Sequence, residues 1–179
     1  MRFVDTPIPG AVEVDLERHE DERGFFARVW DPDELLAANL TPSLAQVSIS
    51  RSTRAGTLRG MHFQVAPHEE AKLVRCVRGS IFDVVLDLRA DSPTYLGWHG
   101  VRLDEGNGKA LYIPEGCAHG FQTLSADSDV LYLISSAYVP EASSGVRWDD
   151  PTFGIEWPAA PERTIGERDR AWPDYVRIG

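Results

Sequence analysis

The sequence has little cysteine, no long hydrophobic run and few basic residues, and each shortage excludes a class of protein. Two cysteines, Cys76 and Cys117, are too few and too irregularly spaced for a disulfide framework or a zinc site. No apolar run is long enough to cross a membrane, and the N-terminal stretch MRFVDTPIPG lacks a signal-peptide core. The 18 basic and 28 acidic residues give a formal net charge of -10, which argues against nucleic-acid binding. We therefore expect a cytoplasmic protein with no nucleic-acid and no membrane partner.

Short apolar runs bounded by Gly, Pro, Asn and Asp indicate an all-β chain, and its 179 residues suit a single domain over 1–179. Such spacing is typical of an antiparallel sandwich or barrel. The predicted strand runs are residues 12–16, 25–30, 45–50, 58–64, 72–77, 81–88, 100–103, 110–113, 120–124 and 130–139.

Two helical segments interrupt this pattern. Asp31 can cap a helix, Pro32 suits its first turn, and Glu34 completes a capping-box pattern. A second, short helical turn is predicted near residues 167–171.

Charged residues within the predicted strands need an explanation. In the run 81–88, Asp83 and Asp87 share one strand face with apolar neighbours. A carboxylate in that setting either faces solvent or needs a partner, and periodicity alone leaves both readings open. Arg75, in the preceding run, and Arg78, directly after it, are expected to be solvated charges.

A histidine motif narrows the fold. Gly108, Pro114, Gly116 and His119 have the spacing Gly-x5-Pro-x-Gly-x2-His, which resembles the second signature of the cupin barrels. Metal-binding cupins normally carry an earlier His-x-His, but the equivalent stretch here is His62-Phe-Gln. Three converging metal ligands are therefore not expected.

A longer series of matches identifies a family. The stretch GTLRGMHFQ at residues 56–64 is followed by AKLV at 71–74, FDVVLDLR at 82–89 and AHGF at 118–121. Asp21-x-Arg23-Gly-x-Phe26 precedes these stretches, and Gly154-Ile-x-Trp-Pro and Glu167-Arg-Asp follow them. Together they resemble the dTDP-4-dehydrorhamnose 3,5-epimerase family over nearly the whole chain. The resemblance implies a cupin-type double-sheet β-barrel (jelly roll) with short flanking helices.

The chemistry of such an epimerase needs few groups. A proton beside a ketone is weakly acidic, so its removal requires a base of near-neutral pKa and a fixed donor for the developing enolate. An acid must then return a proton to the opposite face. No cofactor is needed, because the substrate's own carbonyl accepts the electrons.

The resemblance assigns these roles to residues of this chain. His62 matches the base, Asp169 its carboxylate partner, Tyr132 the acid, and Lys72 a substrate contact suited to the enolate. Tyr138 matches a ring that stacks on the nucleotide base. The substrate-binding residues implied by the resemblance are Arg23, Arg28, Gln46, Ser48, Arg59, His119, Tyr138 and Arg168.

Arg59 and His62 raise a question of geometry, because a regular strand would point them to opposite faces. We hypothesise that a bulge or twist at Gly60 turns both inward.

Three positions depart from the family pattern. Arg28 replaces a common glutamate on the thymine side, Ser48 replaces an asparagine, and Ser143 replaces another glutamate. Because these changes concern nucleotide recognition, the sequence supports the chemistry better than the identity of the nucleotide.

The preferred prediction is an isomerase that epimerises C3, C5 or both in a nucleotide-linked 4-keto-6-deoxy sugar, and the resemblance implies a homodimer. A single-centre epimerase or a 3,4-ketoisomerase of the same barrel class is a close alternative. A non-catalytic sugar-nucleotide-binding cupin is a third, and it would exchange no substrate proton. The broken ligand motif disfavours a metal-dependent dioxygenase.

Overall fold

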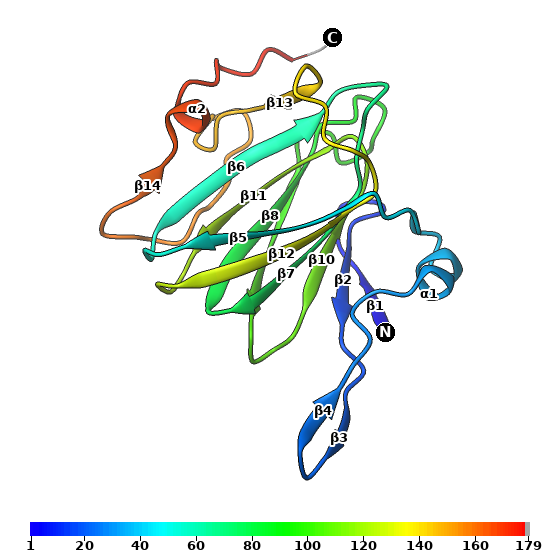
Figure 1. The fold of residues 1–179 in the computed structure, drawn as a ribbon. Helices are drawn as coiled ribbons and strands as arrows, with labels where there is room; N and C mark the ends of the chain where they lie inside the picture. The colour runs from blue at the N-terminus through cyan, green and yellow to red at the C-terminus, as the bar shows by residue number, and fades with distance from the viewer. Residues whose placement is uncertain (178–179) are drawn as a thin grey trace.

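Two antiparallel sheets pack face to face in the computed structural model, which describes residues 1–177 (Figure 1). The first sheet has the order β1 (Arg2–Asp5), β2 (Val12–Asp15), β10 (Ala110–Ile113), β7 (Lys72–Arg78), β12 (Ser128–Ile134) and β5 (Gln46–Ser52). The second has the order β13 (Ser143–Gly145), β6 (Thr57–Gln64), β11 (Cys117–Thr123), β8 (Ser80–Asp87) and β9 (Trp98–Asp104). The predicted double-sheet β fold is confirmed.

Smaller elements flank the two sheets. β14 (Thr164–Ile165) pairs parallel with β6, and β3 (His19–Asp21) and β4 (Gly24–Phe26) form a separate hairpin that extends away from the sandwich (Figure 1). The helices are α1 (Pro32–Ala37) and α2 (Glu167–Arg170). No helix within residues 1–177 has the length and apolar character needed to span a bilayer. The last two residues of the predicted domain, 178–179, lie outside the described residues.

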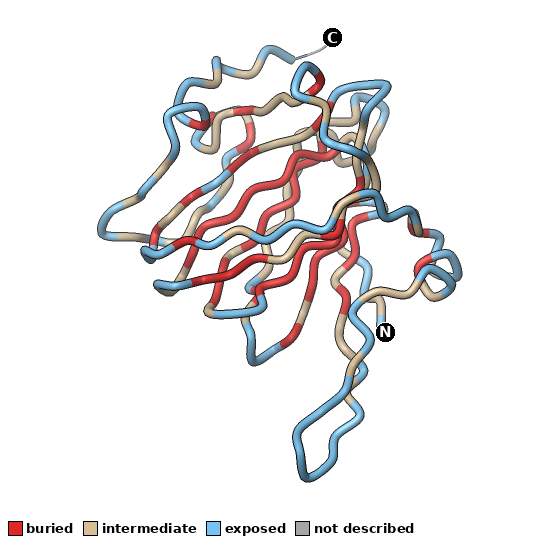
Figure 2. Tube along the Cα trace, viewed as in Figure 1, coloured by how far each residue is buried: buried red, intermediate tan, exposed pale blue. Residues whose placement is uncertain are grey.

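The core lies between the sheets and follows the two-residue period of the strands. Val74 and Cys76 from β7 pack with Val85 from β8 and Phe121 from β11, and all four are almost completely buried. Figure 2 shows the central strands as the buried part of the chain. Burial raises the pKa of the Cys76 thiol to about 11, so this cysteine is an inert core residue.

The predicted helix at Asp31 is present, but half of its cap differs. Asp31 accepts hydrogen bonds from the backbone N–H groups of Asp33 and Glu34, as an N-cap should. The Glu34 carboxylate does not complete a capping box. It binds the N-terminal amino group of Met1, whose positive charge is the stronger partner.

Most predicted strands form within a few residues of their expected bounds, and the predicted run 110–113 coincides with β10. Two predicted runs end early. The run 25–30 stops at Phe26, because β4 pairs only with the short β3, and the run 130–139 stops at Ile134, where β12 loses β5 as a partner.

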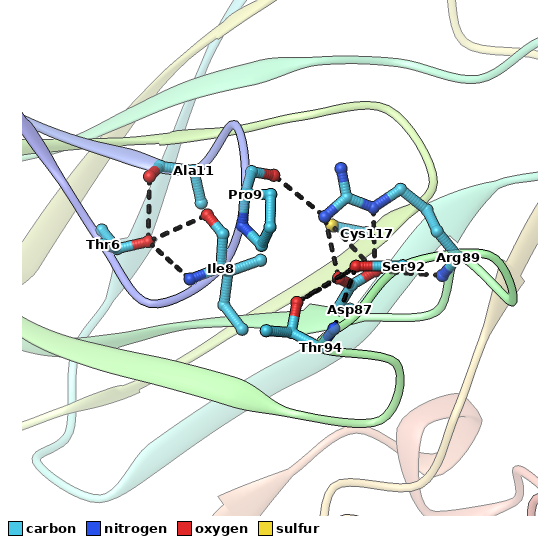
Figure 3. A network of polar contacts seen from close by, with 9 residues as sticks. All are labelled: Thr6, Ile8, Pro9, Ala11, Asp87, Arg89, Ser92, Thr94 and Cys117. Carbon is cyan, nitrogen blue, oxygen red and sulfur yellow. Dashed lines mark hydrogen bonds and ion pairs between the residues drawn. The ribbon is translucent and has the colours of Figure 1, made fainter.

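Both aspartates of β8 are completely buried, so the reading of a solvated face is wrong. Figure 3 shows the network around Asp87, which accepts hydrogen bonds from Arg89, Ser92 and Thr94. Burial by itself would raise the pKa of Asp87, but these bonds, led by that from Arg89, lower it to about 2. Arg89 also donates to the Pro9 carbonyl, so the network ties the end of β8 to the N-terminal segment.

Arg75 also corrects an expectation. Its residue is 4% exposed, because it shares a covered face of β7 with Leu73, which packs in a buried cluster with Val12 and Leu35. Its two terminal nitrogens have no hydrogen-bond partner among residues 1–177, and burial lowers its pKa to about 10. Arg78, by contrast, is exposed as expected.

Candidate active site

A cavity of about 370 Å³ brings the four predicted catalytic residues together. Strands β6, β7 and β12 and helix α2 supply them, so both sheets and the C-terminal segment contribute. The residues of the predicted site that line the cavity are Gln46, Ser48, Arg59, His62, Lys72, His119, Tyr132, Tyr138, Arg168 and Asp169. Segments from across the sequence thus converge on one site.

His62 and Asp169 form a close pair at the wall of this cavity. Nε2 of His62 lies 2.6 Å from Oδ1 of Asp169, and the other carboxylate oxygen accepts the Gly60 backbone N–H at 3.1 Å. Burial would raise the pKa of Asp169, but the hydrogen bond with His62 holds it below its usual value. Because an ionised carboxylate only accepts, Nε2 carries the hydrogen, and Nδ1 of His62 is left to accept a proton.

A bulge in β6 makes this arrangement possible. His119 pairs with His62 and Phe121 pairs with Arg59, so β6 has one more residue over this stretch than β11. Gly60 has φ +131°, and a Cβ there would lie 2.5 Å from the Gly120 Cα. Arg59 and His62 both line the cavity. The hypothesis of a bulge at Gly60 is therefore confirmed.

His119 and Asp83 form a second, more deeply buried pair. Nε2 of His119 lies 2.7 Å from Oδ1 of Asp83, and the other oxygen of Asp83 has no partner among residues 1–177. The His119 ring meets the Tyr132 ring edge to face, with centroids 6.1 Å apart. Asp83 therefore orients a histidine that packs against the predicted acid.

Lys72 is held by a residue that sequence reasoning missed. Its ammonium group lies 2.9 Å from the Glu70 carboxylate and donates a longer bond of 3.4 Å to the His62 carbonyl. Both side chains are about nine-tenths buried, and Glu70 lines the cavity. The signal available in the sequence was an acidic residue two positions before Lys72, although Glu70 precedes β7 and strand parity does not place it.

Tyr132 also has a partner that was missed. Its hydroxyl lies 3.1 Å from that of Ser50 on β5, and both residues line the cavity. Burial raises the pKa of Tyr132, while the hydrogen bond from Ser50 works in the opposite direction. Ser50 shares strand parity with Gln46 and Ser48, which the sequence placed in the site.

The remaining cationic and aromatic groups lie around these pairs. Arg59 is held by the Ser52 hydroxyl at 3.3 Å and the Arg51 carbonyl at 3.2 Å. Arg168 donates to the Ser143 hydroxyl at 2.9 Å. Guanidinium groups of this kind suit phosphate oxygens. Hydrogen bonding, chiefly to Ser143 and then to Arg168, lowers the pKa of the exposed Tyr138.

Arg23 and Arg28 do not line this cavity. Arg23 pairs with Asp21 within the β3–β4 hairpin, and Arg28 lies 3.3 Å from Asp31 and 3.8 Å from Glu34. Both arginines are more than half exposed. Within one chain, therefore, the site lacks these two predicted contacts.

Comparison with known proteins gives consistent matches. Residues 5–176 match the family described as dTDP-4-dehydrorhamnose 3,5-epimerase. A relative with that name from Methanothermobacter thermautotrophicus is 43% identical over 173 residues, covering 96% of this chain and 92% of the relative. A dTDP-4-dehydrorhamnose 3-epimerase from Streptomyces niveus is 43% identical, covering 88% of this chain and 76% of that protein.

A solved structure with a bound sugar nucleotide is also similar. The 3,5-epimerase from Legionella pneumophila, in complex with dTDP-4-keto-L-rhamnose, superimposes with a TM-score of 0.90 at 32% identity. The match covers 98% of this chain and 99% of that one.

Proposed function

The chain belongs to the dTDP-4-dehydrorhamnose 3,5-epimerase family, and we propose that His62, Asp169, Lys72 and Tyr132 carry out its reaction. It is an isomerase that epimerises a dTDP-linked 4-keto-6-deoxy sugar beside the ketone. The observation that carries the proposal is the His62–Asp169 pair at 2.6 Å, which shares a cavity with Lys72 and Tyr132.

His62 acts as the base. Its Nδ1 takes a proton from the carbon beside the ketone, and the electrons of the broken C–H bond move into the enolate. The carboxylate of Asp169 stabilises the imidazolium that results and prevents the ring from turning.

Lys72 and Tyr132 complete the cycle. The Lys72 ammonium stabilises the enolate oxygen, and its burial strengthens this interaction because water is largely excluded. Tyr132 then gives its hydroxyl proton to the opposite face of the same carbon. The enolate electrons form the new C–H bond, the carbonyl is restored, and the configuration at that carbon is inverted.

A second candidate function is inversion of one carbon centre instead of two. The Streptomyces niveus relative is named as a 3-epimerase, and its identity to this chain equals that of the 3,5-epimerase from Methanothermobacter thermautotrophicus. Inversion at C3 alone would use the same base and acid.

Nuclear magnetic resonance in heavy water tests both points. With dTDP-4-keto-6-deoxyglucose, the wild type should incorporate deuterium at C3 and C5, or at C3 alone for a single-centre enzyme. His62→Asn should abolish incorporation at both positions. His68→Asn is the matched control, because His68 lies in an exposed loop outside the cavity. Native exchange by His62→Asn would exclude His62 as the base.

The homodimer is also part of the proposal. Phe25 and Phe26 on the β3–β4 hairpin are 54% and 69% exposed, and Val47 and Ile49 on β5 are 59% and 65% exposed. Such apolar groups gain free energy when they are covered by another chain. The hairpin of one subunit, with the segment that follows it, would place Arg23 and Arg28 at the partner's cavity. Light scattering should give twice the chain mass, and a monomer at assay concentration would contradict this.

Arg28 bears on nucleotide recognition. A guanidinium only donates hydrogen bonds, so it can bind the carbonyls of thymine or a phosphate but cannot accept the thymine N–H. The affinities of dTDP, CDP, UDP and GDP for wild type and Arg28→Glu measure its role. Unchanged affinity and ranking would show that Arg28 takes no part.

We also propose a cytoplasmic location. Both cysteines are unpaired, buried thiols, a state that reducing compartments maintain. Cell fractionation would test this.

A further inference from the structure

The inward face of β5 holds a row of polar side chains, and three of them contact residues of the proposed site. The Gln46 side chain accepts the Tyr138 backbone N–H at 2.8 Å, and Ser50 meets the Tyr132 hydroxyl at 3.1 Å. Further along the strand, the Ser52 hydroxyl accepts a hydrogen bond from Arg59 at 3.3 Å. β5 is the last strand of its sheet, so the row lies at an edge of the sandwich.

The proposed reaction determines which of Ser50 and Tyr132 donates the hydrogen bond between them. A tyrosine that acts as an acid must point its hydrogen at the substrate carbon, so it cannot donate that hydrogen to Ser50. Ser50 is then the donor, and the Tyr132 oxygen is the acceptor. Within the described part of the chain, no other side chain lies within hydrogen-bonding distance of the Tyr132 hydroxyl.

Each inversion also leaves the acid and the base in the wrong protonation states for the next turnover. His62 has gained a proton from one face of the carbon, and Tyr132 has lost one to the other face. The next turnover requires His62 to release its proton and Tyr132 to regain one. Burial and the Asp83 carboxylate make a tyrosinate costly at this position, whereas the hydrogen bond from Ser50 and the positive charge of Arg59 reduce that cost.

We propose that Ser50 is a further catalytic residue, which donates a hydrogen bond to the Tyr132 oxygen and returns a proton to it from solvent. When the Tyr132 O–H bond breaks and the new C–H bond forms, the electron pair stays on the Tyr132 oxygen and accepts the Ser50 hydrogen bond. The Ser50 proton moves to that oxygen as a solvent water gives a proton to Ser50 in the same concerted step, and the proton that His62 releases to solvent neutralises the hydroxide left by the water. The inference rests on the proposed role of Tyr132 as the acid.

Ser50→Ala separates this role from a structural one. Proton removal by His62 does not use Ser50, so deuterium should still enter the substrate at close to the native rate. Formation of inverted product should fall roughly 10- to 100-fold, the range expected for losing a hydrogen bond to a charged group. Ser50→Thr keeps a hydroxyl and should restore inversion. Ser43→Ala removes a serine from the exposed loop before β5 and should match the wild type in both rates.

Other results would overturn the inference. An equal fall of exchange and inversion in Ser50→Ala would mean that Ser50 only supports the fold, and no change in either would mean that it has no role. Ser50→Cys, which keeps the size of the side chain with a weaker donor, replaces Ser50→Ala if that variant unfolds. It should lose inversion before exchange, and an equal loss would again overturn the inference.

The acid itself is tested in the same assay. Inversion by Tyr132→Phe at the native rate would remove Tyr132 as the acid, whatever Ser50→Ala does. If Tyr132→Phe loses inversion while Ser50→Ala keeps it, only the role of Ser50 is wrong. The double variant should lose no more inversion than Tyr132→Phe alone, because the two groups act in one step.

Discussion

Asp83 and Asp87 lie on the same face of β8 and are both completely buried, yet their surroundings differ. Asp87 accepts hydrogen bonds from Arg89, Ser92 and Thr94, which satisfy its charge within one compact network (Figure 3). Asp83 has one partner, His119, and an oxygen without a hydrogen bond among residues 1–177.

The difference separates a carboxylate that stabilises the fold from one that serves a site. A carboxylate whose oxygens are all hydrogen-bonded is rigidly held, and it links the loops that supply its donors. An incompletely bonded one costs free energy, and it persists beside a cavity where a histidine needs orientation. Asp169 also serves a site, although both of its oxygens are bonded, because they hold the proposed base and the bulge at Gly60. Four measurements examine this division, in order of expected effect.

Asp169→Asn should have the largest effect. The amide cannot stabilise a positively charged His62, so turnover should fall roughly 10³- to 10⁴-fold, as when the carboxylate of a catalytic triad is neutralised. The unfolding free energy should change little, because the amide can still hold His62 and Gly60. Deuterium exchange and urea unfolding measure the two quantities. Glu167→Gln, on the exposed side of α2, is the control. If the variant loses stability but keeps turnover, Asp169 has a structural role like that of Asp87.

Asp87→Ala should have the opposite profile. Removing this carboxylate leaves Arg89, Ser92 and Thr94 without their shared acceptor, so the unfolding free energy should fall by about 3 kcal/mol. Turnover per folded molecule should stay native, because Asp87 lies outside the cavity. Asp91→Ala, at an exposed position in the same loop, should be neutral. A loss of turnover without a loss of stability would show that Asp87 serves the active site and does not mainly stabilise the fold.

Acid titration should show the contribution of Asp87 in the wild type. The pKa of Asp87 is lowered from 3.8 to about 2 in the folded chain. Its contribution is therefore complete above the unfolded value and is lost as the pH falls from about 4 to about 2, which amounts to about 2 kcal/mol. Asp169, whose pKa is also lowered, contributes in the same direction. Asp87→Ala should lack the Asp87 part of this decline in unfolding free energy, and an identical pH dependence would contradict the assignment.

Asp83→Asn should have the smallest effect. Asp83 reaches the substrate only through His119, so kcat/KM should fall about tenfold, the size of one modest hydrogen-bond contribution. Stability should be nearly native, since the amide replaces an oxygen that has no partner. Steady-state kinetics and thermal unfolding would measure both. A large loss of stability would show that Asp83 is structural like Asp87.

The sequence predicted the fold class and the cavity residues from motifs, but it missed features that depend on distant partners. Alternation in β8 placed Asp83 and Asp87 on one face, yet only the three-dimensional arrangement shows which residues surround them. The short strands β1, β3, β13 and β14 carry no strong pattern of their own, because pairing with neighbours is what extends them. Arg75 appeared solvated because no local signal shows that a strand face will be covered. Ser50 followed the strand parity of Gln46 and Ser48, but parity alone does not identify a contact, and Glu70 lies before β7, where parity gives no guide.

The protruding β3–β4 hairpin has a genetic consequence. If the hairpin of one subunit completes the partner's cavity, as we propose, each active site is formed by residues from two chains. A chain with Arg23→Ala and a chain with His62→Asn would each be defective alone. Mixed subunits would contain one site that combines a native hairpin with a native base. Co-expression of the two defective chains should therefore restore part of the activity, which two separately defective monomers could never do.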